Sequence, residues 1–139
     1  MTSWQFWALL AAVFAALTAV LAKVGVESIN PDFAMFIRTA VVLLALSVLL
    51  LATGKFESLQ GVSRKSLVFL VLSGFATGAS WWCYFRALKL GDATRVASLD
   101  KLSVVFVALI AAVFLGESLS MLNWLGIVLI AAGAALMFH

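Results

Sequence analysis

Long apolar runs separated by short polar links fill almost the whole of this sequence. Five of these runs are near twenty residues in length, at about 4–22, 32–53, 66–89, 93–115 and 119–138. A helix needs about twenty residues to cross a hydrocarbon layer about 30 Å thick. Backbone polar groups in lipid must bond within their own segment, and the runs lack the alternation of barrel strands. The pattern therefore predicts an all-α integral membrane protein of five transmembrane helices, organised as a single membrane domain over residues 1–139.

Helix start and stop signals stand at the ends of these runs. Asn30-Pro31-Asp32 combines a capping side chain, a proline at the first helical position and an acid at the positive end of the helix dipole. A glycine follows the second run, and each of the three later runs has a small capping side chain before it or a glycine after it. These signals are Gly54, Ser63 or Ser66, Gly91, Asp92, Gly116, and Ser118 or Ser120.

Composition agrees with a membrane protein and excludes other classes. The hydrophobic content of 65% is far above the roughly 45–50% of soluble domains. The net charge of +3 would suggest nucleic acid only if the Lys and Arg residues formed a stripe, but they sit at helix ends. The sequence shows no metal-ligand cluster, nucleophile–base set or phosphate loop, and its single histidine, His139, is expected to be a solvated end. We therefore expect neither an enzyme nor a nucleic-acid partner.

Basic residues at the helix ends are almost balanced between the two sides of the membrane. Orientation follows an excess of Lys and Arg on the cytoplasmic side. Three of these residues flank one side and four flank the other, which is compatible with insertion in both orientations. They are Lys55, Arg64 and Lys65 on one side, and Lys23, Arg86, Lys89 and Arg95 on the other.

Three charged residues lie inside the predicted spans, where each costs about 2.5–3.5 kcal/mol at the helix centre. Arg38 lies about 10 Å into the second span, and Asp100 and Lys101 lie about 12 Å into the fourth. Both spans start on the same side, so Arg38 and Asp100 can pair if the two helices are neighbours. Consecutive residues point about 100° apart, so one of Asp100 and Lys101 can make the structural pair while the other faces a cavity. The alternative is that all three fix helix packing or snorkel toward headgroups.

The third span carries an aromatic cluster at the same level, made of Trp81, Trp82, Tyr84 and Phe85. Thr77, Trp81 and Tyr84 share one helical stripe. An aromatic wall beside cations suits an amphipathic organic solute through stacking or cation–π contact. The alternative is an interfacial aromatic belt.

Small residues mark two helix faces. Gly74 and Gly78 form a small-xxx-small pair in the third span, and Gly126 and Gly133 lie at heptad spacing in the fifth. Small residues let helices approach closely in lipid. These glycines are therefore candidate dimer or helix-packing positions.

Four stretches together resemble the EamA-type members of the drug/metabolite transporter superfamily, and among them the single-unit, five-span bacterial and archaeal group. They are 84–93, 98–104, 115–120 and 126–133. The resemblance implies a solute carrier that works by alternating access, and larger members look like two such units fused in inverted orientation. Many members carry proline in the fourth span, where this chain has Leu102-Ser103-Val104, so no proline break is expected there.

The last helix, Gly-x-x-Leu-Ile-x-x-Gly, is also similar to the dimerising helix of small multidrug resistance proteins. Those proteins look to a glutamate in the first span for proton coupling. The first span here has no acid, so their multidrug antiport is not carried over.

The sequence thus predicts a homodimeric secondary transporter of a small organic solute in the cell (inner) membrane, with an antiparallel pair favoured by inverted-repeat logic. Arg38 and Lys101 would attract the solute, Asp100 would pair or take up a proton, and Trp81, Tyr84 and Thr77 would line the path. No cofactor is indicated, and a proton or sodium ion is the coupling ion to test. The alternative is a non-transporting membrane assembly or lipid-handling subunit.

Balanced basic residues lead to a first testable prediction. A reporter fused to either terminus of the chain is expected to be labelled from both sides of the membrane, because neither orientation has a clear excess of Lys and Arg. Accessibility of each tag in sealed inverted and right-side-out vesicles measures this. Labelling of each tag from one side alone would contradict dual insertion.

Overall fold

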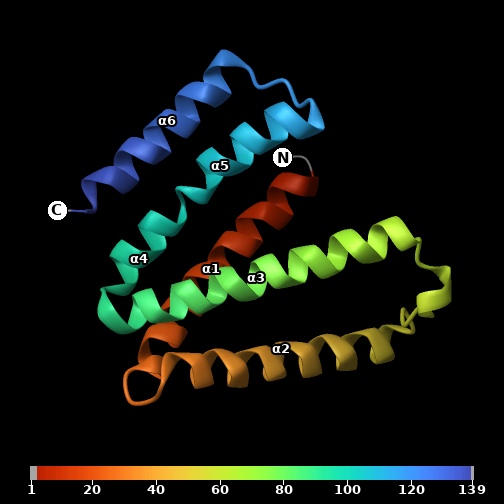
Figure 1. Ribbon diagram of the computed structural model, residues 1–139. Helices are drawn as coiled ribbons and strands as arrows, with labels where there is room; N and C mark the ends of the chain where they lie inside the picture. The colour runs from red at the N-terminus through yellow and green to blue at the C-terminus, as the bar shows by residue number, and fades with distance from the viewer. Residues whose placement is uncertain (1–2, 139) are drawn as a thin grey trace. The chain divides into compact units, whose positions relative to one another are not determined.

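The computed structural model describes residues 3–138, and these residues form helices and no strand (Figure 1). The predicted all-α membrane fold is confirmed; His139 lies outside the described residues. The helices are α1 (Ser3–Val26), α2 (Pro31–Thr53), α3 (Arg64–Leu90), α4 (Ala93–Asp100), α5 (Ser103–Ile110) and α6 (Met121–Leu136). A short 3₁₀ turn, Leu59–Gly61, lies between α2 and α3, and a π-helical turn, Ala111–Leu115, follows α5.

Four described segments are long and apolar enough to cross a membrane, namely α1, α2, α3 and Ala93–Leu115. The fifth apolar helix, α6, has 16 residues and spans about 24 Å, somewhat less than a hydrocarbon core of about 30 Å. A short span is accommodated by local thinning of the bilayer or by flanking residues. Large apolar side chains are exposed along the helices; Leu21, Leu43 and Phe75 are 69%, 67% and 75% exposed. Lipid is the solvent that suits such a surface.

The predicted start and stop of α2 are both present in the structure. Asn30 has an extended backbone, and its side-chain oxygen accepts a hydrogen bond of 2.8 Å from the Asp32 amide. Pro31 is the first helical residue, where its missing N–H costs nothing. Gly54 ends the helix at φ 64°, a left-handed conformation that glycine adopts without steric cost.

The structure selects between the capping alternatives for the later helices. Ser63 accepts from the Ser66 amide at 3.1 Å and so opens α3, while Ser120 accepts from the Asn123 amide at 3.3 Å and opens α6. The prediction for Asp92 was wrong in part. This residue stands at the cap position of α4, but its side chain makes no capping hydrogen bond.

The fourth span is interrupted, although it has no proline. The helix stops at Asp100 and resumes at Ser103 (Figure 1). Amides across this junction bond to the carbonyl three residues back; Lys101 N to Ser98 O is 3.2 Å and Leu102 N to Leu99 O is 3.0 Å. The Ser98 hydroxyl also donates to the Thr94 carbonyl at 2.8 Å, a bond that competes with the helix ladder and bends helices. A proline is therefore not needed for a break in this span.

The chain divides into two compact units. The hairpin unit is Val24–Lys89, and the terminal unit combines residues 1–23 with 90–139. In the terminal unit α6 packs against both α4 and α5, and Lys23 Nζ donates to the Gly91 carbonyl at 2.9 Å. The hairpin unit contains α2, α3 and their connection. The single membrane domain over residues 1–139 stays a prediction.

The break between α4 and α5 generates a second prediction. Amides at 101–104 are expected to exchange hydrogen roughly ten-fold faster than amides at the centre of α2, because a tightened turn protects its backbone less than a regular helix does. Hydrogen–deuterium exchange of the protein in lipid nanodiscs measures both segments in one sample. Equal protection of the two segments would contradict the interruption.

Candidate functional site

One end of the hairpin unit joins α2 to α3 through a two-point ion pair. Arg86 Nε and Nη2 on α3 donate to the two carboxylate oxygens of Asp32 on α2, at 3.3 and 3.1 Å. This fork geometry is stronger and more directional than a single contact. The side chains of Arg86 and Asp32 are 51% and 46% exposed, as expected within a turn or so of the helix ends. The pair therefore fixes the register of the two helices more than it adds free energy.

Arg38 is held against aromatic rings. Its guanidinium carbon lies 4.2 Å from the centre of the Trp81 ring and 5.5 Å from that of Phe85. Ring faces attract a cation by about 0.5–2 kcal/mol, most strongly away from water. Among the described residues of the hairpin unit, no carboxylate forms an ion pair with Arg38. Arg38 is thus a cation in a spanning helix that its own unit orients but does not neutralise.

Two further cations of α3 have partners in the hairpin unit. Arg86, besides its bond to Asp32, stacks on Trp82 with 4.1 Å between the guanidinium carbon and the ring centre. Lys89 Nζ donates to the carbonyls of Val26, Glu27 and Ile29 at 2.6, 2.7 and 3.3 Å. A cation that satisfies the last carbonyls of a helix stabilises its negative end. Lys89 therefore ties the end of α1 and the link after it to α3.

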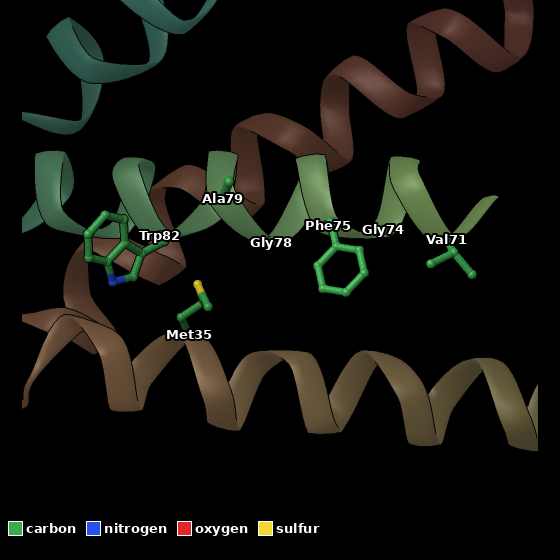
Figure 2. Close-up of a pocket in the computed structure, with 7 residues that line it drawn as sticks. All are labelled: Met35, Val71, Gly74, Phe75, Gly78, Ala79 and Trp82. Atoms are coloured by element: carbon green, nitrogen blue, oxygen red, sulfur yellow. The ribbon is translucent and has the colours of Figure 1, made fainter. Parts of the chain in front are cut away.

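A groove runs along the face of α3 that carries Trp82 (Figure 2). Its volume is about 690 Å³, and it is lined by Met35 of α2 and by a stripe of α3 that runs from Val71 to Trp82. All lining residues are apolar. In Figure 2 the side chains of Phe75 and Val71 point toward α2, and Met35 and Trp82 lie at the same end of the groove. The groove can hold an apolar group and offers it little polar contact.

The structure brings some of the predicted site residues together in the hairpin unit. Trp81 contacts Arg38, and Gly74 and Gly78 line the groove. Tyr84 is half-buried on the stripe that Trp81 shares. The Thr77 hydroxyl donates to the carbonyl of Ser73 at 2.9 Å and is thereby engaged with its own helix. Their roles in binding stay predictions.

Asp100 and Lys101 lie at the junction between α4 and α5 in the terminal unit. Lys101 Nζ and Asp100 Oδ2 are 3.9 Å apart, and the side chains are 57% and 43% exposed. This is a weak contact, so both charges keep most of their capacity for another partner. The predicted Arg38–Asp100 pair stays a prediction.

Glycines 126 and 133 have open space around them. A methyl group built at either position meets no atom of the terminal unit within 4 Å, and the same holds for Gly74 and Gly78 within the hairpin unit. Each unit by itself therefore leaves these faces unfilled. Their predicted role in packing against a partner is not tested by these distances.

Sequence reasoning missed the pairing of Asp32 with Arg86. Asp32 was interpreted as a helix-start signal and Arg86 as a topology signal, and both interpretations considered one helix at a time. The available signal was the hairpin itself, since each residue stands roughly six turns from the connection between α2 and α3. Antiparallel neighbours bring such positions to one level.

The chain is similar to known membrane transporters. The model of the EamA-like transporter family matches residues 2–139. A protein of Sinorhizobium sp. named "Uncharacterized transporter in cobO 3'region" is 60% identical over 135 residues, which is 97% of this chain and 96% of that protein. No solved structure matches the chain.

The two-point ion pair leads to a third prediction. Arg86→Met is expected to lower the free energy of unfolding by about 1–2 kcal/mol, because it removes the bonds to Asp32 and the stacking on Trp82 together. The free energy of unfolding of Arg86→Lys should lie between those of the wild type and Arg86→Met, because lysine keeps the charge but cannot bond both carboxylate oxygens as the guanidinium does. Thermal unfolding in detergent measures both. The matched control is Arg64→Met at the other end of α3, and a midpoint for Arg86→Met equal to that of the control would contradict the prediction.

Proposed function

The chain belongs to the EamA-like transporter family and is a multi-pass membrane transporter, and from this premise we propose that it carries a small organic solute as an antiparallel homodimer. The family confirms the sequence-based resemblance and the prediction that the chain is not an enzyme. It also favours a carrier over the non-transporting subunit considered from the sequence. The dimer, the alternating-access mechanism and the cell (inner) membrane are parts of the proposal.

The proposal rests on the surroundings of Arg38, which stacks on aromatic rings but forms no ion pair within its unit. A guanidinium inside a membrane span is costly unless it meets water or an anion, and the rings of Trp81 and Phe85 offset only part of that cost. The hairpin unit supplies no carboxylate to Arg38. A solute with an anionic or zwitterionic group would complete this site. In the proposed cycle Asp100 is the competing partner of Arg38 when solute is absent, or takes up a proton.

The interrupted span supports a wet surface at Asp100 and Lys101. Irregular backbone within a membrane is tolerated where protein or a water-filled cavity satisfies it, and broken helices are common at the binding sites of secondary transporters. Asp100 and Lys101 stand at such a break. We propose that Lys101 attracts the solute from this break and that Trp81, Tyr84 and Thr77 line the path.

The open space beside Gly126 and Gly133 supports association with a second copy of the chain. Helices in lipid associate through close packing rather than through hydrophobic burial. Gly126 and Gly133 present a smooth strip on α6 with no neighbour from their own unit. A second chain in the opposite orientation would cover this strip and would reproduce the inverted repeat of secondary transporters. A proton or sodium ion is the proposed coupling ion.

The fourth prediction concerns Asp100 and Lys101. Asp100→Asn and Lys101→Met are expected to abolish solute uptake into proteoliposomes while leaving the fraction of dimer unchanged, because each removes a charge from the proposed passage and little packing. The probe is chosen from radiolabelled monocarboxylates and zwitterionic amino acids as one that raises the thermal midpoint of the wild-type protein.

The matched controls for this test are Glu117→Gln and Lys55→Met, which remove charges from connections outside the helices. These variants should transport as the wild type does. Normal uptake by both Asp100→Asn and Lys101→Met would reject their roles, and a monomeric wild-type protein in lipid would reject the dimer.

A further inference from the structure

The apolar groove of the hairpin unit follows a single strip of α3 residues. Its α3 residues recur every three or four positions, so they occupy one face of the helix, and the strip from Val71 to Trp82 is about 16 Å long. Gly74 and Gly78 deepen the strip, because a side chain at either position would have open space before it. An unbranched or flat apolar body of about this length could lie along such a strip.

Positive charge stands at one end of this strip. Trp82 is its last α3 residue and carries the Arg86 guanidinium on its ring. The preceding residue, Trp81, points about 100° away and carries Arg38. The two cations thus stack on neighbouring tryptophans at this end of the strip, and neither belongs to the groove lining itself. Arg86 pairs with Asp32, while Arg38 forms no ion pair within the described residues of this unit. With Lys89 and Glu27 counted at the same end, three cations stand against two carboxylates, and one positive charge remains in excess.

From this arrangement we infer that the solute is an amphipathic organic carboxylate, with its hydrophobic body along the α3 strip and its carboxylate against Arg38. This deepens the proposed function and rests on it. A guanidinium binds a carboxylate at two points with high directionality. The stacked rings hold Arg38 in one orientation, which lowers the entropy lost on binding.

The effect of the ligand's head group on binding distinguishes a carboxylate ligand from lipid chains that enter the groove nonspecifically. Lipid chains would enter an apolar strip whatever their head group, because their contacts are nonspecific. A site with excess positive charge binds a carboxylate more tightly than an alcohol or an ammonium compound of equal chain length. The expected preference is about ten-fold or more, since hydrogen bonds to charged groups contribute about 1.5–3 kcal/mol.

The experiment measures binding of radiolabelled dodecanoate, dodecanol and dodecyltrimethylammonium to the full chain in phosphatidylcholine nanodiscs, with empty nanodiscs subtracted. Wild type should prefer dodecanoate. Arg38→Met should abolish the preference, and Arg38→Lys should restore part of it, because the charge returns without the fork. Gly78→Leu should block all three probes by filling the strip. The matched control is Ser73→Leu, which adds the same bulk to the opposite face of α3 and should bind as the wild type does.

Two outcomes would overturn the inference. The first is equal binding of the three probes or an unchanged preference in Arg38→Met, which would mean that lipid chains fill the groove. The second is that Gly78→Leu disrupts the dimer while dodecanoate binding persists, which would assign the strip to a contact between copies. Binding does not require transport, so failure here is distinguishable from failure of the carrier proposal. A protein that transports another solute in an Asp100-dependent manner, but does not bind dodecanoate, would retain the proposed function and lose this ligand.

Discussion

The cost of charge in hydrocarbon is the constraint on which the site depends. A charged side chain within a span must be paired, stacked or hydrated. The hairpin unit uses the first two means: Asp32 pairs with Arg86 at two points, and aromatic rings stack on Arg38 and Arg86. Only pairing cancels charge. Stacking orients Arg38 and leaves it positive, and this is the condition for a site that accepts an anion.

Backbone polar groups in hydrocarbon are also costly unless they are hydrogen-bonded within the protein. The segment 93–115 crosses the break between α4 and α5 with its amides bonded three residues back, so the interruption still satisfies backbone donors within the chain. Asp100 is therefore the last residue of α4, and Lys101 stands on the short turn that follows it. A turn of this kind changes direction with little loss of bonding, and a charged pair upon it is better placed beside water than in lipid.

The sequence predicted the features that depend on neighbouring residues. Hydrophobic runs indicated the helices, and Asn30-Pro31 and Gly54 marked the ends of α2 where the structure has them. Prediction was weaker where the cause lies elsewhere in the chain. The role of Asp32 is set by Arg86, 54 positions away, and no periodicity within one helix reveals it. The interruption after Asp100 was missed because proline was the only breaker considered, whereas a serine bonded to its own helix and tightened amides suffice.

The sign of the embedded charge bears on what kind of solute the family fold carries here. Small multidrug resistance proteins, which the last helix resembles, look to an acid in the first span, and α1 has none. In the hairpin unit the cations Arg38, Arg86 and Lys89 lie toward the same end of α2 and α3 as the carboxylates of Asp32 and of Glu27, which precedes α2. Lys89 donates to backbone carbonyls and Arg86 pairs with Asp32. Of these three cations, Arg38 is therefore the one that neither a carboxylate nor a carbonyl is shown to bind. A cationic drug would be repelled from this end, and an anion attracted to it, by the same uncompensated charge. The apolar strip alone would admit either, so in the proposed site selectivity would come from Arg38 and the rings that stack on it.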